Sequence, residues 1–191
     1  MNTSVRRFSP TSVRDGLHVM ETFAGVTCGV LQSALAVGYK VRMYTYFDRD
    51  PISRKMAGTK LRWLQSAYPA LLMDAAVQAF DKRLPQNISL VSPLFLGKLV
   101  VRHEPVDLPW GSWECQSVSR AGEQRGMAAS RFRFFYDLVR ITNFFQREQT
   151  SPLLYLFENT WPGRSQTDAV RKASALVQSF IGAPVMADAA G

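Results

Sequence analysis

The chain has 191 residues, of which 47% are apolar and only 20% charged, a composition that fits about one globular domain. No apolar run approaches the roughly 20 residues of a membrane span, and the polar start lacks the apolar segment of a secretory signal. Two distant cysteines and two histidines argue against a disulfide framework or a metal site and fit a reducing, intracellular compartment. The net charge of +8 suits a polyanionic partner, although a moderate positive charge is also common in proteins that never contact nucleic acid. We expect a flexible tail over residues 1–16 and one domain over 17–191.

A strand is predicted from Leu17 to Phe23, followed by a glycine-containing turn and a helix that ends at Gly38. Such a turn leaves backbone N–H groups and a helix N-terminus facing a ligand, the geometry that nucleotide-like cofactors use. A second strand is predicted from Lys40 to Phe47, with Asp48 and Asp50 just past its end. A carboxylate at this place is suited to ribose hydroxyls. The alternatives are a simple tight turn for the glycines and helix N-capping for the carboxylates, above all for Asp50. Cys28 is interpreted as a packed core thiol.

From residue 52 to about residue 83 the pattern is helical, and Pro69 divides it into two helices. The segment LPQNISLVS, which contains Asn87, is predicted as a short third strand region. The fourth strand is predicted from Val106 to Trp110. Pro109 cannot donate a ladder hydrogen bond, so it indicates an early strand end or a bulge there.

An amphipathic helix is predicted from Ser130 to Gln149, with its aromatic side chains in the core. Arg131 lies at its start, where a cation opposes the helix dipole, so either an anionic partner such as phosphate compensates it or it is simply solvated. Leu153 to Phe157 is a continuous apolar run, as expected of a parallel strand buried on both faces. Glu158 follows directly, and a glutamate there is costly unless it is paired or used. A last helix, with Thr167 as a candidate cap, precedes the start of a sixth strand, PVMADAAG.

The stretch VDLPWGSWECQSVSRAGEQRG, residues 106–126, presents Cys115 in a loop after a strand, which is a way to expose a nucleophile. Its spacing resembles the catalytic loop of DNA (cytosine-5) methyltransferases, in which a Pro-Cys-Gln step and an S-x-A-G run carry the attacking cysteine. The string FAGVTCG resembles the S-adenosylmethionine loop of the eukaryotic de novo branch of that family, and LFEN resembles its Glu-Asn-Val step. The resemblance implies an α/β, Rossmann-like methyltransferase fold. Its sheet would be mostly parallel, with helices on both faces and an incomplete C-terminal edge.

The resemblance also implies the site residues. Cys115 would attack a cytosine flipped out of DNA, and Glu158, with Asn159 beside it, would stabilise the charge that builds on the base. The cofactor, S-adenosyl-L-methionine, would be held by residues near the ends of the first three strands: Phe23, Ala24, Gly25, Val26, Thr27, Asp48, Arg49 and Asn87. The DNA would be contacted by Gln116, Ser117, Ser119 and Arg131.

Two departures from the family pattern bear on activity. Glu114 replaces the proline before the cysteine, and a carboxylate that faces a thiol disfavours the thiolate. The seventh strand, the target-recognition region and the last helix of the family have no counterpart in the sequence, so we expect the isolated chain to be incomplete as an enzyme. Two alternatives remain. One is a truncated, non-catalytic module that binds S-adenosylmethionine, DNA or a partner subunit through an open sheet edge. The other is an unrelated Rossmann-like enzyme that acts on another acceptor.

Overall fold

The computed structural model describes residues 15–23, 25, 28–78, 87–103, 105–113, 125–150, 153–159 and 167–182. The chain divides into two compact units, which are described separately. The first comprises Met1–Ser112 with Arg140–Phe157, and the second Trp113–Val139 with Glu158–Gly191. Most of the predicted tail and all of the predicted sixth strand lie outside the described residues.

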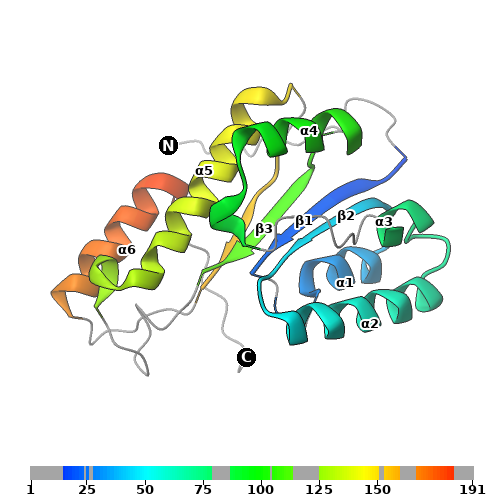
Figure 1. Ribbon diagram of the computed structural model, residues 1–191, viewed down its shortest axis with the longest axis horizontal. Coiled ribbons are helices and arrows are strands. Elements are labelled where there is room, and N and C mark those ends of the chain that lie inside the picture. Colours follow the sequence, from blue (N-terminus) through cyan, green and yellow to red (C-terminus); the bar gives the residue numbers. More distant parts are fainter. Residues whose placement is uncertain are drawn as a thin grey trace, which may run out of the picture. The chain divides into compact units, whose positions relative to one another are not determined.

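The first unit is built on a four-stranded sheet in the order β2-β1-β3-β4 (Figure 1). The strands are β1 Leu17–Thr22, β2 Val41–Phe47, β3 Leu108–Ser112 and β4 Leu156–Glu158. All four run parallel, and Val19 of β1 lies opposite Tyr44 of β2 on one side and Leu108 of β3 on the other. The parallel α/β sheet expected from the sequence is therefore confirmed.

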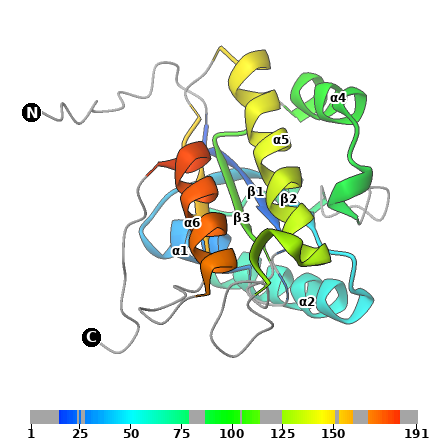
Figure 2. The same ribbon diagram turned by 90° about the vertical axis from the view of Figure 1, so that its left-hand side faces the viewer.

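Helices cover both faces of this sheet (Figures 1 and 2). They are α1 Gly29–Ala36, α2 Pro51–Ala67 and α3 Asp74–Gln78 on one face, and α4 Pro93–His103 and α5 Arg133–Glu148 on the other. Side chains alternate along a strand, so each strand contributes to two cores. Val19 and Tyr44 pack in the first core with Leu31 of α1, whereas Phe47 packs edge-on against Phe95 of α4, with ring centroids 6.3 Å apart.

Local signals in the sequence set the start and end of α2 as predicted. Asp50 is its N-cap and accepts a hydrogen bond from the Ser53 N–H at 2.7 Å, and Pro51 occupies the first helical position. Pro69 follows the C-cap residue Tyr68 and separates α2 from α3. The predictions of β1, α1, β2 and α2 are confirmed to within one or two residues.

The predicted third strand is wrong. The described part of that segment forms a short 3₁₀ helix, η1 Ile88–Leu90, and α4 follows it. Asn87 caps this turn, since its side-chain oxygen accepts a hydrogen bond from the Ser89 N–H at 3.1 Å. Pro93 then opens α4, a position at which proline costs no hydrogen bond.

The strand at Pro109 neither ends early nor bulges, so that prediction is also wrong. β3 continues to Ser112, and its pairing with β1 is in unbroken register. Bonds to β1 flank the proline on both sides. The Asp107 N–H donates to the His18 carbonyl at 3.0 Å, and the Thr22 hydroxyl donates to the Trp110 carbonyl at 3.0 Å. The sheet tolerates the missing N–H of Pro109 because the residues on either side of it remain hydrogen-bonded to β1.

β4 is shorter and more exposed than the sequence predicts. Leu154 and Leu156 are 60% and 51% exposed, so the expectation of a strand buried on both faces is wrong. Within the described residues, β4 has a neighbour only on the β3 side, and an edge strand buries less of its surface. Glu158 at its end is exposed as well, so the cost expected for burying this carboxylate does not arise.

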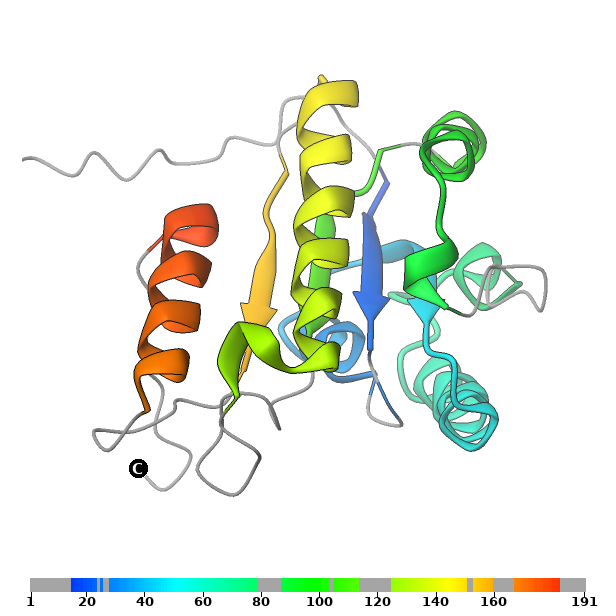
Figure 3. The same ribbon diagram turned by 60° about the vertical axis from the view of Figure 1, so that its left-hand side comes forward.

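The second unit gathers aromatic side chains between two helices. Its elements are η3 Gly126–Ala128, η4 Ser130–Phe132, the first half of α5, and α6 Asp168–Ile181 (Figure 3). The ring of Phe135 lies 5.1 Å from that of Trp113 and 6.0 Å from that of Phe180. The Thr167 hydroxyl accepts a hydrogen bond from the Val170 N–H at 3.3 Å, so its predicted role as the cap of α6 is confirmed. The predicted helix from Ser130 is also confirmed, except that its first turn is the 3₁₀ helix η4.

Candidate functional site

The loop after β1 brings predicted cofactor residues together at the carboxyl edge of the sheet. The Phe23 N–H donates to the Phe47 carbonyl at 2.9 Å, and the Gly25 N–H donates to Oδ2 of Asp48 at 3.0 Å. The Tyr46 hydroxyl donates to the Gly25 carbonyl. Phe23 and Gly25 both have φ near 55°, a conformation that glycine adopts freely and phenylalanine only under strain. The ends of β1 and β2 are thus tied into one loop structure.

Asp48 fixes this loop through both of its carboxylate oxygens. Oδ2 accepts the Gly25 N–H, and Oδ1 accepts the Asp50 N–H at 2.9 Å. Each oxygen retains a lone pair that a hydroxyl group could use. The alternative role considered for both carboxylates, helix capping, belongs to Asp50. The Ser53 hydroxyl and N–H bind its carboxylate and lower its pKa.

Arg54 is a neighbour of this loop that sequence reasoning missed. Its guanidinium donates to the Asp48 carbonyl at 3.4 Å and lies 5.9 Å from the centre of the Tyr46 ring. The signal was available, since Arg54 stands one helical turn after the cap Asp50, on the helix α2 that follows Asp48. The predicted residue Arg49 lies exposed between the two carboxylates.

A buried carboxylate under the loop was also missed. Glu21 is fully buried, and its Oε1 accepts a hydrogen bond from the Leu31 N–H in the first turn of α1 at 2.7 Å. Oε2 of Glu21 has no hydrogen-bond partner among the described residues, and the same holds for the Tyr44 hydroxyl. The Tyr44 hydroxyl is nevertheless close enough to stabilise the charged form of Glu21 over the protonated form. Burial raises the pKa of Glu21, an effect that the Leu31 N–H opposes. Glu21 is the only acidic residue in the predicted first strand, and this feature of the sequence could have identified it.

Cys28 is a core thiol, as the sequence predicts. It is fully buried at the start of α1, and burial raises its pKa to about 11. A thiol in that environment is a poor nucleophile, because the thiolate form is disfavoured.

Asn87 makes a local bond, the one that starts η1. The predicted cofactor residues Ala24, Val26 and Thr27 lie outside the described residues. So does the segment of the predicted nucleophile and DNA contacts, which includes Glu114, Cys115, Gln116, Ser117 and Ser119.

In the second unit, Asn159 links two predicted functional segments. Its side-chain amide donates to the Trp113 carbonyl at 2.9 Å. Trp113 is buried, packs on Phe135, and stands two residues before Cys115. The segment that leaves β4 is therefore held against the residue that leads into the thiol loop. Arg131 is exposed in η4.

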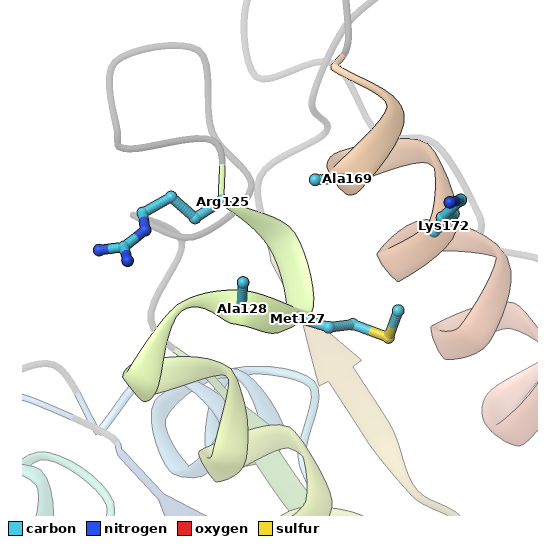
Figure 4. A pocket seen from close by; sticks show the side chains of 5 residues that line it. All are labelled: Arg125, Met127, Ala128, Ala169 and Lys172. Atoms are coloured by element: carbon cyan, nitrogen blue, oxygen red, sulfur yellow. The ribbon is translucent and has the colours of Figure 1, made fainter.

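An open pocket of about 450 Å³ also lies in the second unit (Figure 4). It is lined by Arg125, Met127, Ala128, Ala169 and Lys172. The two cationic side chains point away from one another in Figure 4, so these two described polar groups do not converge on a ligand. None of the predicted catalytic or cofactor residues that the structure describes lines this pocket.

The chain matches none of the models of known protein families and none of the curated proteins with which it was compared. Across the described ranges, no helix is both long enough and apolar enough to span a bilayer. The described residues also contain no group of three or more His, Cys, Asp or Glu side chains that could hold a metal ion. What the chain does must therefore be inferred from its own residues.

Proposed function

We propose that this chain is the cofactor and catalytic half of a DNA (cytosine-5) methyltransferase-like protein. It would transfer a methyl group from S-adenosyl-L-methionine to carbon 5 of a cytosine flipped out of DNA. The observation that carries this proposal is the hydrogen bond from Asn159 to the Trp113 carbonyl. It joins the segment of Glu158 to the one that leads to Cys115, and a shared site on one base needs these two segments close together.

The loop after β1 supports the cofactor half of the proposal. A side chain added at Gly25 would meet no described atom within 4 Å, so none of the described residues fills the space beside this glycine. Phe23 offers a half-buried ring, and Asp48 offers unused lone pairs for ribose hydroxyls. These groups fit S-adenosylmethionine, which would be held here with Ala24, Val26, Thr27, Arg49 and Asn87. When bound, it supplies an electrophilic methyl group on a sulfonium.

The chemistry of the base would depend on two side chains. The Cys115 thiolate would add to carbon 6 of the ring, which makes carbon 5 nucleophilic. After carbon 5 has taken the methyl group, loss of its proton to a base would expel the thiolate and restore the ring, a step that fluorine at carbon 5 blocks. Glu158 would hydrogen-bond ring nitrogen 3 and the exocyclic amine and stabilise the charge that builds there. The base must leave the duplex to be reached, and Gln116, Ser117, Ser119 and Arg131 would contact the DNA around it.

A trapping assay tests the proposal. Duplex DNA that contains 5-fluorocytosine is incubated with the full chain and S-adenosylmethionine, and covalent capture is measured on a denaturing gel. The catalytic proposal requires capture that Cys115→Ser abolishes and that the matched change of the buried thiol, Cys28→Ala, preserves. Absence of capture by the folded wild-type chain would overturn the catalytic proposal.

The second candidate function is a non-catalytic module that binds S-adenosylmethionine, DNA or a partner subunit. The exposure of Glu158 favours it, because a carboxylate in water stabilises charge on a base less than one in a site that excludes water. Calorimetry with S-adenosylhomocysteine separates the two. Cofactor binding without capture supports the module, whereas methylation of RNA or a small molecule but not DNA supports an unrelated methyltransferase.

A further inference from the structure

Helix α2 carries large apolar side chains on a surface that faces solvent. Ile52 is 68% exposed, Met56 51% and Trp63 57%. The same helix buries a separate set of residues in the core of the first unit: Ala57, Leu61 and Leu64. Single exposed apolar residues are ordinary, but several on one line indicate a contact surface.

These three side chains form one line on the helix. At about 100° per residue, positions 52, 56 and 63 fall within about 40° of one another. Along the axis they extend over about 16 Å, at 1.5 Å per residue. We call Ile52, Met56 and Trp63 the α2 stripe. It is long enough for about three turns of a partner helix and too narrow to be a second core face.

Cations flank the α2 stripe on both sides. On the same helical projection, Lys55 and Arg62 lie along one flank and Lys60 along the other. Lys55 and Arg62 are exposed, and Lys60 is half-buried. The sequence of α2, PISRKMAGTKLRWLQSA, contains four basic residues and no Asp or Glu. A partner that covers the stripe therefore gains from carboxylates on both sides of an apolar seam.

We propose that the α2 stripe is a docking surface for an acidic amphipathic segment of a partner protein. The apolar side chains of that segment pack on Met56 and Trp63, and its carboxylates face Lys55, Lys60 and Arg62. Tryptophan and arginine are the residues most enriched among the energetically dominant positions of protein interfaces.

Other occupants fit the α2 stripe less well. A helix that lies in a membrane needs an apolar face at least about 100° wide, and the remaining apolar face of α2 is sealed in the core. DNA phosphates would use the cations but not the apolar line. A second copy of the chain would place its own lysines and arginine against Lys55, Lys60 and Arg62, and like charges repel. Residues 1–14 of the chain itself carry three arginines and no carboxylate, so they lack the complementary charge.

The test uses the full chain and a synthetic helical peptide with leucines on one face and glutamates on both flanks. A control peptide keeps the glutamates and replaces the leucines with serine. Affinity is measured by fluorescence anisotropy of the labelled peptides. We expect the leucine peptide to bind at least about tenfold more tightly than the control, and Trp63→Ser to remove that advantage. Met56→Ser should weaken binding in the same direction, whereas Leu94→Ser, at an exposed leucine outside the stripe, should not.

Equal binding of the two peptides, or an unchanged affinity in Trp63→Ser, overturns the proposal. Vesicles of phosphatidylserine and a short DNA duplex are titrated in parallel. If either binds in a way that depends on Trp63 and the leucine peptide does not, the partner is a membrane or a nucleic acid and the proposal is wrong. Circular dichroism confirms that each variant is folded.

Discussion

Removal of the Asp48 carboxylate is expected to release the loop after β1. In Asp48→Ala, the Gly25 N–H and the Asp50 N–H both lose an ionised acceptor. A hydrogen bond to a charged group contributes about 1.5–3 kcal/mol, and Asp48 is only half-buried, so water replaces part of both bonds. We therefore expect a loss of about 2 kcal/mol in the free energy of unfolding, which for a chain of this size lowers Tm by about 4–8 °C.

Amide hydrogen exchange makes this prediction specific to the loop. In Asp48→Ala the Gly25 amide should lose its protection, and affinity for S-adenosylhomocysteine should fall with it. The matched control is Asp50→Ala, which removes the N-cap of α2 at a cost of about 1 kcal/mol and leaves the acceptor of Gly25 in place. If the Gly25 amide exchanges equally fast in the wild type and in Asp48→Ala, the carboxylate does not hold the loop and the reasoning fails.

Two further substitutions probe buried features. Because burial raises the pKa of Glu21, the stability that its protonated form contributes is complete below the unfolded pKa and is lost as the pH rises through the folded pKa. Glu21→Gln should therefore gain stability over the wild type in urea unfolding as the pH rises above the unfolded pKa of glutamate, about 4.3, and a constant difference would contradict this. Gly126→Ala should destabilise by about 2–4 kcal/mol, because φ is +54° and the new Cβ would lie 2.3 Å from the Ala169 carbonyl oxygen. Gly182→Ala, at φ +85° with no described atom within 4 Å, should cost clearly less, and equal losses would rule out the steric account.

Elements whose signals are local could be predicted from the sequence. Asp50 and Pro51 start α2, and Thr167 starts α6, because a cap acts on N–H groups only a few residues away. Apolar periodicity identified β1 and β2 for the same reason. The segment around Asn87 shows the limit of prediction from composition. Its residues favour a strand, but the Asn87 side chain accepts a hydrogen bond from the N–H two residues later, and the chain forms η1.

Burial could not be predicted in the same way. The run from Leu153 to Phe157 reads as a strand covered on both faces, yet Leu154 and Leu156 are more than half exposed. A run of apolar residues records what a strand can bury, whereas its position in the sheet decides what it does bury. Pro109 is the converse case. Paired neighbours on either side keep it inside β3 although its composition argues for an end.

The sequence alone determined that this chain forms a parallel α/β fold, and it pointed to Gly25, Asp48 and Asn159 as residues of interest. Only the tertiary structure decided that Asp48 reaches back 23 residues to Gly25, and that Asn159 reaches back 46 residues to Trp113. The physical reason is that such bonds depend on which strands become neighbours. The order β2-β1-β3-β4 is set by the packing of the whole sheet, and no short stretch of residues contains it.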